Sequence, residues 1–325
     1  MEKTTMKVAL AQLAPVWLDK LATRDRILEQ MEIAAQAGTD LLVFGEGYWP
    51  GYPFWLAYTE GAAWDLPINK EIHGHYVKNG VCIEEGDLKP VQEKCKQLKL
   101  ALYLGIMERP LQRGGHSLYC SLVYIDQEGE IGSVHRKLQP TYDERLTWSP
   151  GDGNGLRVHP LKGFRVGGLN CWENWMPLPR ASLYGQGENV HIAVWPGGLH
   201  NTKDITRFIA RESRSYVLSV SAVLRKDQIP TDTPHHAEFI DKMPDCLANG
   251  GSCIAGPDGE WEVEPVLEEE TLIYHELDLD RIYQERMNFD PVGHYSRPDV
   301  TRLYVNYERQ STLTDKSLPL PPNFK

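Results

Sequence analysis

The chain has 325 residues, a formal net charge of −11 and a hydrophobic content of 41%. This length and composition allow a large buried core, and α/β folds often reach such a size as one domain. The acidic balance argues against a nucleic-acid partner, because phosphate contacts need a basic face. No apolar run approaches the ~20 residues of a membrane span, so no membrane partner is expected either.

The cysteines and the first residues indicate the expected compartment. The six cysteines form neither a CxxC pair nor a zinc-type cluster, and they are interpreted as reduced thiols. The amino-terminal residues lack the apolar stretch of an export signal. A cytoplasmic location is therefore expected. The cysteines are Cys82, Cys95, Cys120, Cys171, Cys246 and Cys253.

Short apolar runs alternate with helical stretches in the first part of the chain. The runs are typical of strands buried in a sheet, and Gly38 is a helix stop signal. The segment 49–81 is long, aromatic and irregular, which is typical of a functional or interface-forming loop. The predicted strands cover residues 7–13, 40–44 and 100–107, and the predicted helices cover residues 20–37 and 91–98.

Two hairpins and a strand–helix–strand unit are predicted in the remainder. The alternation of strands and helices favours an α/β fold, and the hairpins indicate that its sheets are mixed. No composition shift divides the chain, so one domain over residues 1–305 is expected, followed by a loose tail over 306–325. The hairpins cover residues 117–135 and 251–263, and the unit consists of strands 190–195 and 216–223 around a helix over 205–215.

Three titratable residues each follow a predicted strand directly before a turn. They are Glu46, Lys137 and Cys171. Side chains at such positions point into the crevice at the carboxyl edge of a sheet, so we expect the three to converge. Proline at positions 177 and 179 indicates a helix start shortly after Cys171, and the positive end of a helix would favour its thiolate.

These residue types form a chemically coherent set. A carboxylate in an apolar site has a raised pKa and can exchange a proton with a thiol near neutral pH. A buried ammonium stabilises a thiolate and the negative charge that develops on an attacked group. Glu144, seven residues after Lys137, is a candidate second carboxylate that orients the lysine or a substrate.

Each of these residues also has a structural interpretation. Cys171 alone would most often be a buried core thiol, and Glu46 could be a turn carboxylate. Glu144 could pair with Arg136 or Arg145 at the surface. The residues alone leave both interpretations open.

Three separated blocks resemble the signature blocks of the nitrilase superfamily. They are residues 44–53 (FGEGYWPGYP), 135–141 (HRKLQPT) with Glu144 and Arg145, and 167–174 (GGLNCWEN). Residues 290–299 are similar to the family's carboxyl-terminal block, so the resemblance extends from about residue 7 to residue 304. Cys-Trp-Glu followed by Met176-Pro177 resembles the true nitrilase branch.

The resemblance implies a role for each matched residue. Cys171 would be the nucleophile, Glu46 the general base and Lys137 the charge-stabilising residue, with Glu144 as the family's second glutamate. The backbone N–H of Trp172 would help Lys137 to polarise the intermediate. The implied fold is a four-layer α-β-β-α sandwich with two mixed sheets, which pairs into homodimers or larger homo-oligomers and needs no cofactor.

The chain departs from the family pattern at two places near the expected site. Asn174 stands where many relatives have histidine, and Tyr142-Asp143 stand where His-Val is common. Substrate preference is what these departures put in doubt. The residues predicted to bind substrate are Tyr52, Trp172, Trp195 and His200.

Other ligand classes have little support. His73 with His75, and His235 with His236, lack a clear third ligand for a metal, so no metal is expected. Neither a P-loop nor a GxGxxG element is present, so no nucleotide is implied.

The expected function is hydrolysis of a small-molecule nitrile to a carboxylic acid and ammonia, with some amide product possible. The aromatic-rich neighbourhood favours aryl or arylaliphatic nitriles. An aliphatic amidase and a cyanide hydratase of the same superfamily are the enzymatic alternatives. A non-catalytic self-assembling protein is the alternative of a different class.

Overall fold

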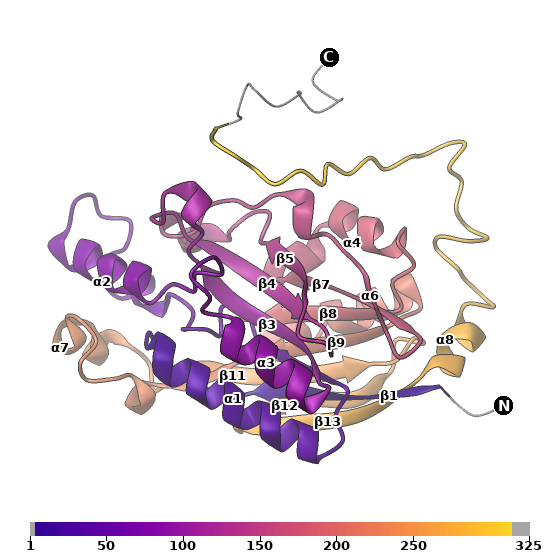
Figure 1. Cartoon of the computed structure of the whole chain (residues 1–325), viewed down its shortest axis with the longest axis horizontal. Coiled ribbons are helices and arrows are strands. Elements are labelled where there is room, and N and C mark those ends of the chain that lie inside the picture. Colours follow the sequence, from indigo (N-terminus) through magenta and orange to yellow (C-terminus); the bar gives the residue numbers. More distant parts are fainter. Residues whose placement is uncertain (1–3, 314–325) are drawn as a thin grey trace.

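Residues 4–313 are described by a computed structural model in which two β-sheets pack face to face between outer helices (Figure 1). The first sheet has the order β13-β1-β2-β3-β4-β5. β1, β2 and β3 are parallel, whereas β13, β4 and β5 each pair antiparallel with their neighbour. The strands are β1 (Thr5–Gln12), β2 (Leu41–Phe44), β3 (Ala101–Glu108), β4 (Tyr119–Ile125), β5 (Ile131–Arg136) and β13 (Thr271–Asp278).

The second sheet has the order β10-β11-β9-β8-β7-β6, and β12 pairs with β11. β7, β8 and β9 are parallel, and the outer strands are antiparallel, so both sheets are mixed as predicted. The strands are β6 (His159–Leu161), β7 (Phe164–Asn170), β8 (Val190–Trp195), β9 (Tyr216–Ser221), β10 (Val223–Arg225), β11 (Cys246–Ala255) and β12 (Trp261–Leu267).

The helices mostly flank the sheets. The α-helices are α1 (Lys20–Gln36), α2 (Pro67–Lys78), α3 (Lys89–Leu98), α4 (Pro177–Tyr184), α5 (Leu199–Thr202), α6 (Ile205–Ser213), α7 (His236–Phe239) and α8 (Leu279–Glu285). The 3-10 helices are η1 (Phe54–Ala57), η2 (Leu111–Arg113), η3 (Tyr142–Leu146), η4 (Gly153–Gly155), η5 (Cys171–Trp175), η6 (Lys226–Gln228) and η7 (Ile240–Lys242).

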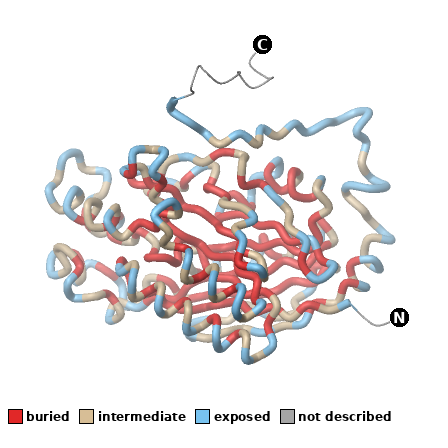
Figure 2. Tube along the Cα trace, viewed as in Figure 1, coloured by how far each residue is buried: buried red, intermediate tan, exposed pale blue. Residues whose placement is uncertain are grey.

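Successive side chains of a strand point to opposite faces of the sheet, so neighbouring residues lie in different layers. Val8 and Leu10 of β1 lie in the core between the sheets, whereas Ala9 and Ala11 face the layer that contains α1 and α3. The outer face of the second sheet packs on α6 in the same way. Most strands are buried, whereas β12 and β13 are partly exposed, and the rest of the exposed surface lies mainly on the outer helices and loops (Figure 2). The predicted α-β-β-α sandwich is thereby confirmed.

The segment 49–81 is more ordered than its composition suggested. It contains η1 and the twelve-residue helix α2, which begins with Pro67 in its first turn. Only Ile72 and Tyr76 of α2 are buried. The helix therefore has a weak apolar periodicity, and the sequence did not predict it. The prediction of an irregular loop over the whole segment was wrong.

Residues 286–313, beyond α8, have no regular secondary structure and return along the surface of the sandwich (Figure 1). Arg309 donates hydrogen bonds to Asp152 and to the Val134 carbonyl, at 3.0 and 2.7 Å. Residues 306–313 of the predicted tail therefore contact the sandwich through Arg309. Residues 314–325 lie outside the described range. Within residues 4–313, no helix has the length and apolar character needed to cross a membrane.

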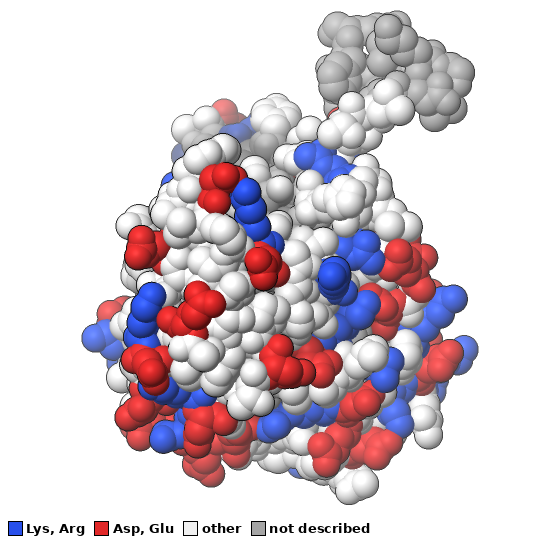
Figure 3. Space-filling model, turned by 90° about the vertical axis from the view of Figure 1, so that its left-hand side faces the viewer, with Lys and Arg blue, Asp and Glu red and all other residues white. Residues whose placement is uncertain are grey.

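The surface carries both signs of charge. On the face next to α2 and α7, lysines and arginines alternate with acidic residues around an uncharged centre (Figure 3). No continuous basic area covers this face.

Candidate active site

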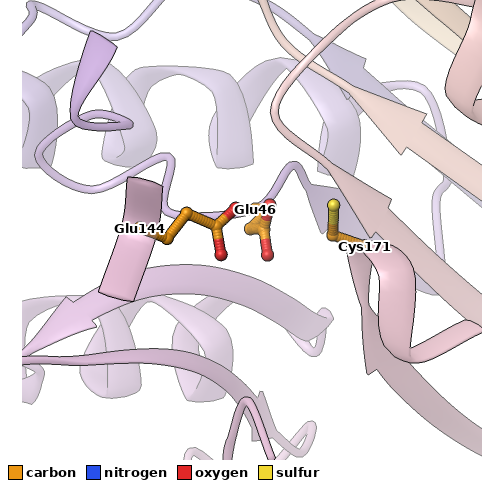
Figure 4. Close-up of side chains that lie close together, drawn as sticks. All are labelled: Glu46, Glu144 and Cys171. Carbon is orange, nitrogen blue, oxygen red and sulfur yellow. The ribbon is translucent and has the colours of Figure 1, made fainter. Parts of the chain in front are cut away.

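Four predicted site residues meet at the carboxyl ends of strands from both sheets. Glu46 follows β2, Lys137 follows β5, Cys171 follows β7, and Glu144 lies on η3. The Lys137 Nζ donates to Glu46 Oε1 at 2.8 Å and to Glu144 Oε2 at 2.6 Å. Carboxylate oxygens of both glutamates and the Cys171 Sγ lie within 4.8 Å of one another, with Glu46 in the middle (Figure 4).

Close backbone contacts hold Glu46 in position. Its N–H donates to the carbonyl of Trp195 at the end of β8, at 3.2 Å, and this bond links the two sheets. A Cβ on Gly105 of β3 would lie 2.0 Å from the Gly45 carbonyl. Glycine is needed there because any side chain would displace the turn that carries Glu46.

The nucleophile candidate has an unusual backbone conformation. Cys171 has a φ of 48°, in the left-handed region, which costs a non-glycine residue about 1–3 kcal/mol. The Asn174 Nδ2 donates to the Cys171 carbonyl at 2.8 Å, and Asn174 Oδ1 contacts the Nε2 of His191 at 2.8 Å. These bonds restrain the strained turn. The amide of Asn174, one of the departures from the family pattern, is therefore occupied by the Cys171 carbonyl and by His191.

Glu173 connects the lysine and cysteine segments. One oxygen accepts from the backbone N–H of Leu138 at 2.5 Å, and the other accepts from that of Asn170 at 2.9 Å. The Nε2 of His135 lies 3.1 Å from the same carboxylate. Each backbone donor is adjacent in sequence to a site residue, so one buried side chain sets the distance between Lys137 and Cys171.

Glu144 has no oxygen free. Its Oε1 accepts from the hydroxyl of Tyr52 at 2.8 Å, and its Oε2 accepts from Lys137 and from the backbone N–H of Thr141 at 2.7 Å. The surface pairs considered for it are wrong, because Arg136 pairs with Glu108 and Arg145 donates to a backbone carbonyl. With both oxygens occupied, Glu144 is suited to orienting Lys137.

Burial dominates the electrostatics of the cluster. It raises the pKa of Glu46 to about 7, with the opposing charge of Lys137 limiting the rise. Burial and the nearby Glu46 charge also raise the pKa of the Cys171 thiol well above its ordinary value. For Lys137, burial lowers the pKa, but the surrounding anionic groups outweigh it and the net shift is upward. The thiol is therefore neutral at rest.

This result corrects the expected reason for thiol reactivity. The hydrogen bond from the Trp172 backbone does lower the pKa of Cys171, but burial raises it more. The turn after β7 is the short helix η5, so a long helix does not point at the sulfur. Thiolate formation therefore requires transfer of the proton to a neighbouring base, for which Glu46, with its pKa raised to about 7, is the candidate.

Metal binding is disfavoured at this cluster by Lys137. Glu46, Glu144 and Cys171 have suitable ligand atoms, but the ammonium donates to both carboxylates and would repel a metal ion. The histidines considered as metal ligands have other contacts. His73 contacts Thr147, His75 contacts the Leu18 carbonyl, and His235 contacts Glu71 and Glu238.

The residues predicted to bind substrate differ in their placement. Tyr52 joins the cluster through Glu144, and its ring packs edge-on against Trp148 at 5.4 Å between centroids. Trp195 is buried in the core against α6, and its backbone carbonyl rather than its ring contacts Glu46. Trp172 is half-exposed and stacked on Trp175, whereas His200 is exposed on α5. Their roles stay predictions.

Cys120 is a site residue that the sequence analysis missed. It lies on β4, its carbonyl accepts from the Lys137 N–H at 2.8 Å, and its Sγ donates to Glu46 Oε1 at 3.5 Å. The hairpin register pairs Ser121 with Arg136, so Cys120 is opposite Lys137. The register of the predicted hairpin was the signal that could have identified it.

Comparisons with known proteins agree with this geometry. A family model described as carbon-nitrogen hydrolase matches residues 7–287. The chain is 36% identical over 303 residues to Nitrilase 2 from an unknown prokaryotic organism, covering 92% of each. It is 35% identical to an aliphatic nitrilase of Rhodococcus rhodochrous, covering 93% of this chain and 79% of that one. A carbon-nitrogen hydrolase structure from Helicobacter pylori G27 shares the fold, with a TM-score of 0.68 and 19% identity over 91% of this chain and 97% of that chain.

The Glu173 contacts generate a stability prediction. Glu173→Ala should lower the free energy of unfolding by about 3–5 kcal/mol, because it leaves His135 and two backbone donors without their buried acceptor. Glu32→Ala is the control, since its ion pair with Lys94 is exposed and should be worth at most about 1 kcal/mol. Chemical denaturation measures both. Equal, small losses would contradict the role of Glu173.

Proposed function

The chain belongs to the carbon-nitrogen hydrolase family, and on this premise we propose that it hydrolyses a nitrile to a carboxylic acid and ammonia. The enzyme is a hydrolase that acts on carbon–nitrogen bonds, and the relatives named as nitrilases favour nitriles as its substrates. The observation that carries the proposal is the buried group of Cys171, Lys137 and Glu46, in which a thiol and a carboxylate of raised pKa lie beside an ammonium.

In the first step, Cys171 attacks the nitrile carbon. Its proton passes to Glu46 as the sulfur–carbon bond forms, and one electron pair of the carbon–nitrogen triple bond moves to nitrogen. The Lys137 ammonium has three N–H donors, and two of them bond to Glu46 and Glu144. The third is left to donate to the substrate nitrogen, where negative charge develops. Glu46 returns the proton to that nitrogen, and the product is a covalent thioimidate.

Water then completes the reaction in two additions. Glu46 takes a proton from the first water as its oxygen bonds to the thioimidate carbon, and passes that proton to the nitrogen. It then transfers the proton of the new hydroxyl to the same nitrogen, so that the carbonyl forms as the carbon–nitrogen bond breaks and ammonia leaves. The thioester that remains is hydrolysed by the second water, which releases the carboxylic acid and restores the thiol. If the carbon–sulfur bond breaks before the carbon–nitrogen bond, the product is the amide.

Aromatic side chains beside the cluster favour a substrate with an aryl or arylaliphatic group. Tyr52 and Trp148 pack against each other next to Glu144 and Lys137, and their ring faces suit a planar substituent. The name of the Rhodococcus relative supports an aliphatic nitrile as the second candidate.

We further place the enzyme in the cytoplasm as a homodimer or larger homo-oligomer. Apolar side chains on η5, α4 and α6 support self-association, because Trp175, Leu178 and Phe208 are 44%, 64% and 52% exposed. Glu46, Lys137, Glu144 and Cys171 belong to one chain, so subunit contact is not required to assemble the cluster.

A substrate panel tests the activity. Purified protein incubated with matched nitriles and amides should release ammonia from the nitriles, with arylaliphatic members turned over fastest. The nitrile carbon is linear and leaves room for the attacking sulfur, whereas the amide gives the same thioester by a different route. Turnover of the amides alone would make the enzyme an amidase.

Substitutions test the roles of the three residues. Cys171→Ala should abolish turnover, and Glu46→Gln and Lys137→Ala should each lower kcat/KM by at least about 10²-fold, the scale of acid–base and electrostatic groups. Cys253→Ala, a buried thiol on β11, is the control and should keep full turnover. Thermal unfolding of each variant checks the fold. Undiminished activity in Lys137→Ala would remove it from the mechanism.

The pH profile tests the base. Glu46 acts when it is deprotonated, and its pKa is about 7, so kcat/KM should rise with pH and level off above about 7. Below that value the rate should fall about tenfold per pH unit. The residual activity of Glu46→Gln should lack this acid limb. An acid limb centred near the ordinary glutamate pKa would contradict the assignment.

A further inference from the structure

The hydrogen bonds to Glu46 are distributed unequally between its two oxygens. Oε1 accepts from Lys137 Nζ at 2.8 Å and from Cys120 Sγ at 3.5 Å. Oε2 is fully buried and has no hydrogen-bond partner within residues 4–313. A buried carboxylate oxygen without a donor is costly and rare, so the asymmetry calls for a functional reason.

The two donors approach Oε1 from different elements. Lys137 follows β5, and Cys120 lies on the neighbouring strand β4. The Cys120 Sγ also lies 3.9 Å from Asn170 Oδ1, but it has only one proton and Glu46 Oε1 is nearer. A donor on a rigid strand restrains the carboxylate against rotation, which a single flexible lysine cannot do.

Given the proposed function, we propose that Oε2 is the oxygen of Glu46 that takes the proton from Cys171 and from water, and that Cys120 is a positioning residue that keeps it free. Lys137 and Cys120 together concentrate their hydrogen bonds on Oε1. The two oxygens are equivalent, so a half-turn of the carboxylate changes nothing, whereas a partial rotation would break the bonds from Lys137 and Cys120 and turn the unoccupied oxygen out of its position. The thiol of Cys120 thus acts through Glu46 and does not touch the reacting atoms.

A thiol is suited to this position because it is a weak donor. A strong donor on Oε1 would stabilise the ionised carboxylate and weaken the base. The bond from Cys120 lowers the pKa of Glu46 only as the smallest of the contributions, and the pKa stays near 7. Cys120 itself stays protonated, because burial raises its pKa well above the ordinary value.

The titration of Glu46 can be followed separately from its neighbours. The groups that face it are Lys137 beyond β5, Glu144 on η3, Cys120 on β4, Cys171 on η5 and Tyr52 before η1. The lysine, both thiols and the tyrosine have pKa values raised above their already high ordinary values. Glu144 is still present in Glu46→Gln, so a carboxyl band that is lost in this variant belongs to Glu46.

Infrared difference spectroscopy against pH measures the protonated carboxyl band of Glu46, identified by its loss in Glu46→Gln. In Cys120→Val, whose slightly larger side chain has no donor, the midpoint should rise by about 0.5–1 pH unit, the effect of one lost hydrogen bond. The acid limb of kcat/KM should move by the same amount, and kcat should fall about tenfold. Cys120→Ser retains a donor, and a stronger one, so its midpoint should lie at or below that of the wild type and its kcat should exceed that of Cys120→Val.

Cys95→Val is the matched control, because Cys95 is equally buried but lies on α3, and it should shift neither midpoint nor kcat. Cys120→Ala replaces Cys120→Val if the larger side chain prevents folding. An unchanged midpoint in the donor-free variant, or equal losses in the serine variant, would overturn the role of Cys120. The infrared titration needs no turnover, so its outcome stands even if the nitrile panel shows no activity.

Discussion

The buried ammonium of Lys137 between two carboxylates is the interaction on which the site depends. It donates to Glu46 and Glu144 in a region where all three side chains are at most 2% exposed. One cation beside two anions leaves an excess negative charge, which burial penalises strongly. The penalty falls on Glu46, whose pKa rises to about 7, because Glu144 has the additional donors Tyr52 and Thr141. Near pH 7, the protonated and ionised forms of Glu46 are therefore nearly equal in free energy.

The sandwich supports this cluster by joining elements of both sheets. Glu46 and Lys137 belong to the first sheet and Cys171 to the second, and the core between the sheets is closely packed. Two buried contacts fix their relative positions: the bond from the Glu46 backbone to Trp195, and the carboxylate of Glu173. The left-handed backbone conformation of Cys171 can persist here, because hydrogen bonds from the surrounding residues hold the turn in place.

The sequence predicted much of the fold and the membership of the site. The apolar runs predicted the central strands to within a few residues, because strands buried on both faces are apolar throughout. Helix α2 was missed, since only Ile72 and Tyr76 of its residues are buried and its period is weak. Trp195 packs in the buried cluster that contains Cys171 and residues of α6, and its predicted role in substrate binding stays a prediction.

The sequence by itself determined which residue types end the strands, and the matched blocks determined the family. The convergence of Glu46 and Lys137 follows from the rule that strand ends share one edge of a sheet, whereas Cys171 follows a strand of the second sheet and joins them because the two sheets pack face to face. Only the tertiary structure decided which oxygen of Glu46 accepts the hydrogen bonds and that burial keeps the Cys171 thiol protonated. These properties depend on burial and on donors from β4, β5 and η3, which are distant in the chain from Glu46. Desolvation and hydrogen-bond geometry are set by packing in three dimensions and leave no signal in the local sequence.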